Sequence, residues 1–280
     1  MKKISRRSFM AAAAVSVAAL ALTACGGSAS TASSAAASSV AASSEAASTS
    51  AAAAELTTVE AGKLTMATNA TFPPYEMTTD SGEIEGIDVD TAKAIAEKLG
   101  LELQIDDMEF DAALLSVQQG KADIVMAGVT VTDERKAVMD FSDSYATGIQ
   151  SIIVPNDSDI ASPDDLAGKK IGTQRGTTGY IYCSDDFGED SVVAYDSGLT
   201  AVQALNNGQV DAVVIDNAPA TEYVAANPGL KVLDTSYAEE DYAIGMAKGS
   251  ALEDAVNKAL EELKADGTLQ AIVDKYINAN

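Results

Sequence analysis

The residues best suited to bind a small charged molecule follow an apolar run in the stretch ADIVMAGVTVTDERK, residues 122–136. The β-prone residues 124–127 predict a buried strand, and Thr130 lies beyond its carboxyl end. Thr132 can cap a helix that begins at Asp133, where acidic residues suit the helix dipole. Arg135 does not suit that position, because a cation is disfavoured at a helix N-terminus. Its guanidinium can instead bind a carboxylate, or it can pair with a neighbouring acid on the surface.

A second candidate group comes from an internal similarity between residues 116–128 (SVQQGKADIVMAG) and residues 204–216 (ALNNGQVDAVVID). Each segment contains a helix end, two amide residues, glycine, two further residues, aspartate and an apolar strand. Alignment on the glycines places Gly128 opposite Asp216. The Asp216 carboxylate can accept an ammonium group at the end of its strand, or it can cap the following helix. If the segments belong to two facing lobes, Arg135 and Asp216 match the two charges of an α-amino acid zwitterion.

Strands and helices that could position these groups alternate from residue 64 onward, which favours parallel α/β layers. The β-branched runs predict strands at residues 63–68, 101–105, 122–128, 169–173, 191–195 and 210–216. Apolar spacing and glycine stops predict helices at residues 88–100, 111–120, 197–208, 218–227, 251–267 and 268–278.

The composition excludes several kinds of site. The chain has 42 acidic and 18 basic residues and a net charge of −24, so nucleic acid and anionic lipid head groups are unsuitable partners. It has no histidine, which excludes histidine-assisted nucleophiles and histidine-ligated zinc. Acidic residues surround Cys183, so an activated thiolate is not expected there. No Ca²⁺-binding loop motif occurs, and we expect no metal site and no cofactor.

The N-terminal residues 1–25 have the pattern of an export signal rather than of a fold. A basic start, MKKISRR, precedes an apolar run that ends in LTAC, the pattern of a bacterial lipobox with lipidation at Cys25. The SRRSFM portion is also similar to a twin-arginine signal, so the export route stays open. Residues 26–55 are rich in alanine and serine and predict a disordered tether, with an alanine-rich helix as the alternative. These features predict a lipoprotein of the Gram-positive surface type, anchored on the outer face of the cell membrane.

The body of the chain, from residue 56 onward, resembles bacterial extracellular solute-binding proteins of family 3, the group that contains glutamine-, histidine- and cystine-binding proteins of ABC importers. The matching motifs occur in the family's order: ATNATFPPYEM, GIDVDTAKAIAEKLG, DMEFDAALLSVQQGKADI, AGVTVTDERKAVMDFSDSY, DDLAGKKIGTQRGTT, GQVDAVVIDN and LKADGTLQAIVDKY. The resemblance implies an α/β protein with the two-lobed type II periplasmic-binding-protein fold. Two strand crossings would form a hinge, with a cleft between the lobes. Lobe 1 would comprise residues 56–146 and 246–280, and lobe 2 would comprise residues 147–245.

The resemblance also implies how the α-groups of an amino acid would be held. Arg135 would bind the ligand carboxylate together with the backbone N–H groups of Thr130 and Thr178. Asp216 would bind the ammonium together with the Gly128 carbonyl and the Thr130 hydroxyl. Residues 175–179, RGTTG, open a helix whose N-terminus is suited to an anion.

Further residues implied by the resemblance would contact the ligand side chain. Phe72 and Phe110 would enclose its aliphatic part, with packing in a core as the alternative for both. Asn69, Gln174 and Thr177 complete the expected contacts. Asn69 stands where histidine- and lysine-type binders have aspartate, and Gln174 stands where a glutamine binder has lysine. These departures favour a polar ligand without a strongly cationic side chain.

The implied function is extracellular capture of an amino acid by hinge closure and delivery to the transmembrane subunits of an ABC permease, without catalysis. A monomer is expected. One alternative is an enzyme on the same fold, similar to a cyclohexadienyl dehydratase, in which a carboxylic acid assists loss of water. Another is a binding module that signals through a separate partner. Neither the bound amino acid nor the permease follows from the sequence.

Overall fold

The computed structural model describes residues 56–277. The predicted signal at 1–25, lipidation at Cys25 and tether at 26–55 lie outside the described residues. None of the helices in the described part is both long and apolar enough to span a membrane. Two separate β-sheets organise this part of the chain, and we use them to define a first and a second lobe.

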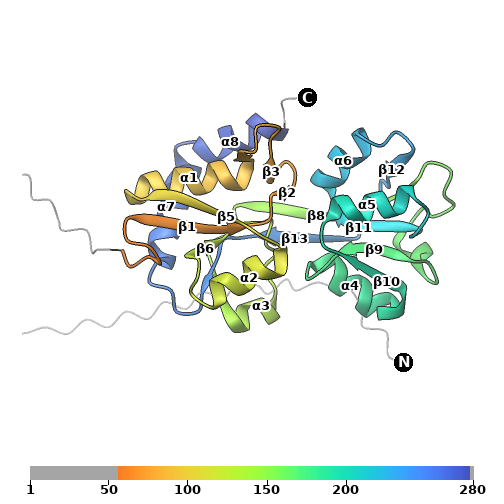
Figure 1. The fold of residues 1–280 in the computed structure, drawn as a ribbon, viewed down its shortest axis with the longest axis horizontal. Coiled ribbons are helices and arrows are strands. Elements are labelled where there is room, and N and C mark those ends of the chain that lie inside the picture. Colours follow the sequence, from red (N-terminus) through yellow and green to blue (C-terminus); the bar gives the residue numbers. More distant parts are fainter. Residues whose placement is uncertain (1–55, 278–280) are drawn as a thin grey trace, which may run out of the picture. The chain divides into compact units, whose positions relative to one another are not determined.

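The first lobe contains a five-stranded sheet in the order β5-β1-β6-β14-β7. Its strands β5, β1 and β6 are parallel, whereas β14 pairs antiparallel with both β6 and β7. The strands are β1 (Lys63–Thr68), β5 (Glu102–Asp107), β6 (Ile124–Val125), β7 (Met139–Phe141) and β14 (Gly245–Ala247). Figure 1 shows helices on both faces: α1 (Ile87–Leu99), α7 (Glu253–Ala265) and α8 (Thr268–Ile277) on one, and α2 (Phe110–Gln118) and α3 (Asp133–Val138) on the other.

The second lobe contains a six-stranded sheet in the order β10-β9-β11-β8-β12, and β13 also pairs with β8. Its strands are β8 (Ala146–Pro155), β9 (Ile171–Gln174), β10 (Val192–Tyr195), β11 (Ala212–Asp216), β12 (Leu230–Val232) and β13 (Ala238–Tyr242). Helices α5 (Gly198–Asn206) and α6 (Asn217–Ala225) lie on one face, and α4 (Thr178–Phe187) lies on the other (Figure 1). Short 3₁₀ turns occupy Pro163–Leu166 and Glu189–Ser191.

A small three-stranded sheet, β2-β3-β4, stands apart from the two large sheets. It comprises β2 (Thr71–Phe72), β3 (Glu76–Thr78) and β4 (Ile84–Glu85), all paired antiparallel.

The chain crosses between the large sheets twice, along β8 and again from β13 into β14. The crossings pair with each other, because β13 runs antiparallel to β8 from Ala238↔Gln150 to Tyr242↔Ala146. The expected two-lobed fold with a two-strand hinge is therefore confirmed, although both sheets are mixed rather than parallel. The antiparallel strands arise at these crossings, which local sequence patterns do not encode. The lobe boundaries at residues 146 and 245 stay predictions; Gly245 itself already pairs with Val125 in the first sheet.

The internal similarity in the sequence corresponds to matching local structure. An amide residue caps the C-terminus of both α2 and α5. The two caps have nearly the same backbone geometry, with φ −88° and ψ 1° at Gln119 and φ −86° and ψ 1° at Asn207. The next glycine has positive φ in each case, 65° at Gly120 and 67° at Gly208. Each turn then leads into the strand, β6 or β11, that ends near the cleft. Strand β6 is shorter than predicted, because only Ile124 and Val125 keep regular pairing.

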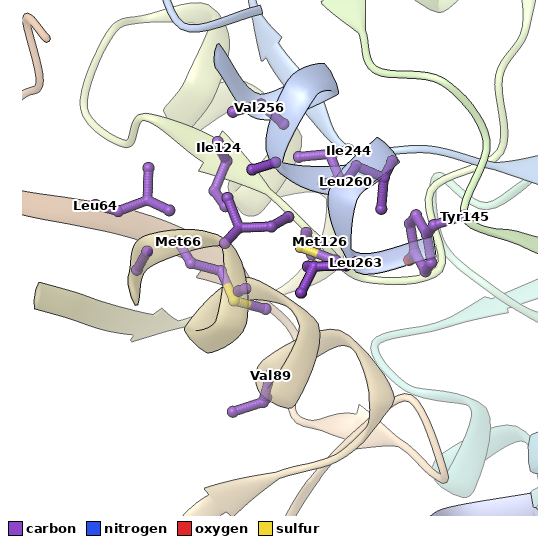
Figure 2. Close-up of a cluster of buried hydrophobic side chains, with 14 of the residues drawn as sticks. Leu64, Met66, Val89, Ile124, Met126, Tyr145, Ile244, Val256, Leu260 and Leu263 are labelled. Atoms are coloured by element: carbon purple, nitrogen blue, oxygen red, sulfur yellow. The ribbon is translucent and has the colours of Figure 1, made fainter. Parts of the chain in front are cut away.

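Alternation along the strands divides the apolar core between the two faces of each sheet. On β1, Leu64 and Met66 pack against α1 and α7, whereas Ala67 packs against α2. Figure 2 shows the larger of these clusters, to which the sheet contributes Ile124 and α7 contributes Leu260. Together these clusters fix the first lobe as a rigid support for the residues at its strand ends.

Truncation of the core at Ile124 tests this packing. Ile124 is fully buried, so Ile124→Ala leaves a cavity and should lower the free energy of unfolding by roughly 2–5 kcal/mol. The matched control is Val59→Ala, because Val59 is 50% exposed and its truncation should change stability by less than about 0.5 kcal/mol. Urea unfolding followed by circular dichroism measures both. Equal losses for the two variants would contradict the packing described.

Candidate ligand-binding cleft

A cleft between the lobes encloses about 450 Å³ of space, including open solvent at its mouth. Its walls come from the strand ends of both sheets and from the hinge strands. All ten residues that the sequence predicts as ligand contacts line it: Asn69, Phe72, Phe110, Gly128, Thr130, Arg135, Gln174, Thr177, Thr178 and Asp216.

Arg135 comes from α3 but points into the cleft, and only 8% of it is exposed. Thr132 caps α3 as predicted, with its hydroxyl accepting the Arg135 N–H at 3.2 Å. The guanidinium donates from Nη1 to the Thr130 carbonyl (2.8 Å) and from Nη2 to the Gly176 carbonyl of the second lobe (3.1 Å). It also lies 5.5 Å from the ring centroid of Phe110. The surface-arginine alternative is therefore wrong, and a buried cation stands at the junction of the lobes.

No carboxylate within residues 56–277 forms an ion pair with this guanidinium. Burial lowers the pKa of Arg135, and the negative charge of Glu240 opposes that shift. Two of its five N–H groups are bonded to carbonyls, so donors remain for an anion.

Asp216 ends β11 and is 98% buried on the opposite lobe, with 2% exposed. Its Oδ1 accepts the Ala218 N–H (2.9 Å) and caps α6, so the capping alternative is correct. Its Oδ2 accepts the Ile149 N–H (2.8 Å) and the Tyr242 hydroxyl (3.0 Å). Burial raises the pKa of Asp216, and these three donors counteract the rise. The capping role and a position on the cleft wall coexist in one residue.

Buried hydroxyl and amide side chains of the two lobes contact each other directly. The Thr130 hydroxyl lies 3.4 Å from that of Thr178 and donates to Glu240 Oε2 at 3.1 Å. Across the cleft, the Gln174 amide nitrogen donates to Asn69 Oδ1 at 2.9 Å. The lobes are therefore in contact, with polar groups bridging the ligand-side surfaces.

The remaining predicted contacts have local structural roles as well. Thr177 caps α4, and its hydroxyl donates to the Gln174 carbonyl at 2.8 Å. Phe110 is 6% exposed and belongs to the core cluster under α2. It therefore packs in the core, as the alternative predicted, and also lines the cleft. Phe72 is half-buried and stacks on Tyr75 with ring centroids 5.7 Å apart.

Gly128 is held in a conformation that favours glycine, with φ +55°. Its N–H donates to Asp88 Oδ2 at 3.0 Å, and a Cβ at this position would lie 2.8 Å from Phe72 Cε1. Burial raises the pKa of Asp88 to about 6.

The sequence prediction missed several cleft residues. Glu76 lines the cleft and is fully buried. Burial raises its pKa well above the ordinary value, together with the nearby charge of Asp88 and a side-chain hydrogen bond with Asp88. Gln150 and Tyr242 line the cleft from the hinge strands, and Glu240 lies behind them, bonded to Thr130 and Gln150. Alternation along β13 would have placed Glu240 and Tyr242 on one buried face, but only knowledge of the strand pairing turns that face toward the cleft.

The family model for bacterial extracellular solute-binding proteins, family 3, matches residues 64–279. The chain belongs to this family. It is 33% identical over 225 residues to the L-cystine-binding protein TcyJ of Escherichia coli (strain K12), covering 79% of this chain and 85% of that protein. Among solved structures, it is 35% identical to the arginine-, lysine-, histidine-binding protein ArtJ of Geobacillus stearothermophilus (TM-score 0.74), covering 78% of this chain and 96% of ArtJ.

An ancestral arginine-binding protein, solved bound to glutamine, is 43% identical to this chain (TM-score 0.74), and 77% of this chain and 98% of that one are covered. These solute-binding proteins are named for binding, not for catalysis. This chain is therefore a binding protein rather than an enzyme, and the dehydratase alternative has no support.

Cys183, the cysteine of the body, lies away from the cleft residues in the core beneath α4. Burial raises the pKa of its thiol to about 12, with a hydrogen bond from Tyr237 opposing the rise. An inert, protonated thiol follows, as the acidic surroundings in the sequence predicted.

The lobes approach each other closely at Gly176. A Cβ at this position would overlap Asp111 Oδ1 of the first lobe, which is the end of an exposed side chain that can rotate away.

Proposed function

We propose that this protein captures an extracellular amino acid and delivers it to an ABC permease by closure of the lobes. The observation that carries the proposal is the pair of buried opposite charges in one cleft, Arg135 from the first lobe and Asp216 from the second. An α-amino acid presents a carboxylate and an ammonium on a single carbon. A ligand that contacts both lobes stabilises their closed arrangement by its differential affinity for it.

The ligand carboxylate would be bound by Arg135 and by backbone N–H groups of Thr130 and Thr178. Thr178 is the first residue of α4, so its N–H has no acceptor within the helix and lies at the positive end of the helix dipole. Asp216 would accept the ammonium, with the Gly128 carbonyl and the Thr130 hydroxyl beside it. Micromolar affinity requires about 8 kcal/mol, a value within reach of a desolvated ion pair at each end of the ligand.

The ligand side chain would lie between Phe72 and Phe110 and reach Asn69, Gln174 and Thr177. The neutral amides of Asn69 and Gln174 support a polar side chain without strong positive charge. An ancestral relative bound to glutamine is consistent with that choice.

A cationic side chain is the second candidate, and Glu76 is the observation that favours it. Its carboxyl lines the cleft beside the Asp88 carboxyl, and a guanidinium or ammonium would pair with its ionised form. Several relatives are named as arginine-binding proteins, including one from Bacillus subtilis that is 34% identical.

The proposal also includes the cellular setting. Removal of residues 1–24 and lipidation of Cys25, the new N-terminus, would anchor a monomer to the outer face of the membrane through the tether at 26–55. Family members are extracellular solute-binding proteins, which supports an exported location. Metabolic labelling with a palmitate analogue, compared between the wild type and Cys25→Ala, tests the anchor.

Arg135→Ala should abolish amino-acid binding while leaving the fold intact, because no other cation lines the described cleft. The ligand is first identified by a thermal-shift screen against the common amino acids and cystine, since binding raises apparent stability in proportion to ln(1 + [L]/Kd). Calorimetry with that ligand then compares the variants. Arg175→Ala is the matched control, because its exposed guanidinium pairs with Asp196. Unchanged affinity in Arg135→Ala would refute the carboxylate assignment.

Glu76→Gln separates the two side-chain candidates. If Glu76 pairs with a cationic side chain, the substitution should weaken arginine binding by about tenfold or more and leave glutamine binding nearly unchanged. Glu83→Gln is the control, since Glu83 is an exposed residue near the same small sheet. The cationic candidate would be excluded if the wild type binds glutamine tightly but not arginine, and if Glu76→Gln binds glutamine equally tightly.

A further inference from the structure

We propose that Tyr242 is a positioning residue. It joins the ammonium acceptor Asp216 to the hinge and to the loop around Thr130, which is proposed to bind the ligand carboxylate. This inference rests on the proposed function, because it assigns Asp216 to the ligand ammonium. Tyr242 does not itself need to touch the ligand. Its role follows from three sets of contacts, made by its backbone, its ring and its hydroxyl.

The backbone of Tyr242 joins the two halves of the site. It ends β13 and pairs with Ala146 at the start of β8. On its other side it forms an isolated antiparallel bridge with Thr130. Hydrogen bonds on both sides of the bridge fix it, from Val131 N–H to the Asp241 carbonyl (3.0 Å) and from Ala243 N–H to the Val129 carbonyl (3.1 Å). The Thr130 loop is therefore attached directly to a hinge strand.

The ring of Tyr242 has little freedom to move, because two glycines and a second aromatic ring confine it. A Cβ at Gly148 on β8 would overlap the ring, and one at Gly128 would lie 3.2 Å from Cε2. The ring of Tyr75 meets it edge-on, with centroids 5.5 Å apart and an interplanar angle of 73°. Tyr242 is 1% exposed, so its hydroxyl is held in one place.

The Tyr242 hydroxyl donates to Asp216 Oδ2 at 3.0 Å. The other two donors to this carboxylate are backbone groups, the N–H groups of Ile149 and Ala218. Ile149 lies on β8, so both hinge strands contact the same oxygen. A change in hinge geometry therefore moves the ammonium acceptor, and a bound ammonium in turn favours the hinge geometry that presents it.

The ionisation of Asp216 depends on the same hydroxyl. The titratable groups that face it are Tyr242 and Glu240 from β13 and Tyr75 from the segment before β3. Burial and the Glu240 charge raise the pKa of Asp216, and the Tyr242 hydrogen bond lowers it. Ammonium binding needs the carboxylate, so affinity falls as the pH drops through this pKa. Loss of the hydroxyl raises the pKa further, and the acid loss of affinity then begins at a higher pH.

Tyr242→Phe tests the proposal, since it keeps the ring between the two glycines and removes the donor. With the amino acid found by the thermal-shift screen, we expect Kd at neutral pH to rise about tenfold and the acid limb of the affinity profile to move to higher pH. Tyr75→Phe is the matched control: this neighbouring tyrosine is also buried but donates no hydrogen bond to Asp216, and it should leave the acid limb unchanged.

A second measurement does not need a ligand. The ¹³Cγ shift of Asp216, followed by NMR against pH, should titrate at a higher pH in Tyr242→Phe than in the wild type or Tyr75→Phe. An unchanged Asp216 titration, or an equal change in both tyrosine variants, would overturn the positioning role. Failure of the wild type to bind any amino acid would refute the proposed function instead, and the NMR titration would still decide the role of Tyr242.

Discussion

The antiparallel pairing of β8 with β13 is the constraint on which the rest of the cleft depends. It holds the two crossings in one register, from Ala238↔Gln150 to Tyr242↔Ala146. Alternation along β13 then buries Glu240 and Tyr242 on one face, where they reach Thr130 and Asp216. Without this pairing, the residues of opposite charge would belong to two unconnected sheets. The hinge is therefore also part of the wall of the site.

The two buried charges are stabilised separately, which keeps each of them available to a ligand in the proposed function. Hydrogen bonds to charged groups contribute about 1.5–3 kcal/mol each, and an isolated buried charge without them is strongly disfavoured. Arg135 has two carbonyls and the face of Phe110, and Asp216 has three donors. Neither charge has a neighbouring residue of opposite sign as an ion-pair partner within residues 56–277. Such preorganised, unpaired charges suit a zwitterion better than they suit the stability of the fold.

Local patterns predicted much of this arrangement, and their limits have physical reasons. The glycine stop after α1 and the Thr132 cap depend on neighbours in the sequence, so spacing alone indicates them. The similarity of the two segments ending at Gly128 and Asp216 indicated that the chain contains two related lobes. Glu76, Glu240 and Tyr242 were missed because they acquire importance only through partners that are 12 to 110 residues away.

Asn69 and Gln174 connect the two lobes at the surface where the proposed ligand would bind. The sequence indicated that both face the ligand side chain, yet their amides bond to each other across the cleft at 2.9 Å. Asn69 Oδ1 also accepts the Thr71 hydroxyl, so its lone pairs are already used. A ligand side chain that competes for these amides must replace contacts that help to close the lobes. In the proposed function, selection of the ligand side chain and the free energy of closure would therefore be coupled through the same two residues.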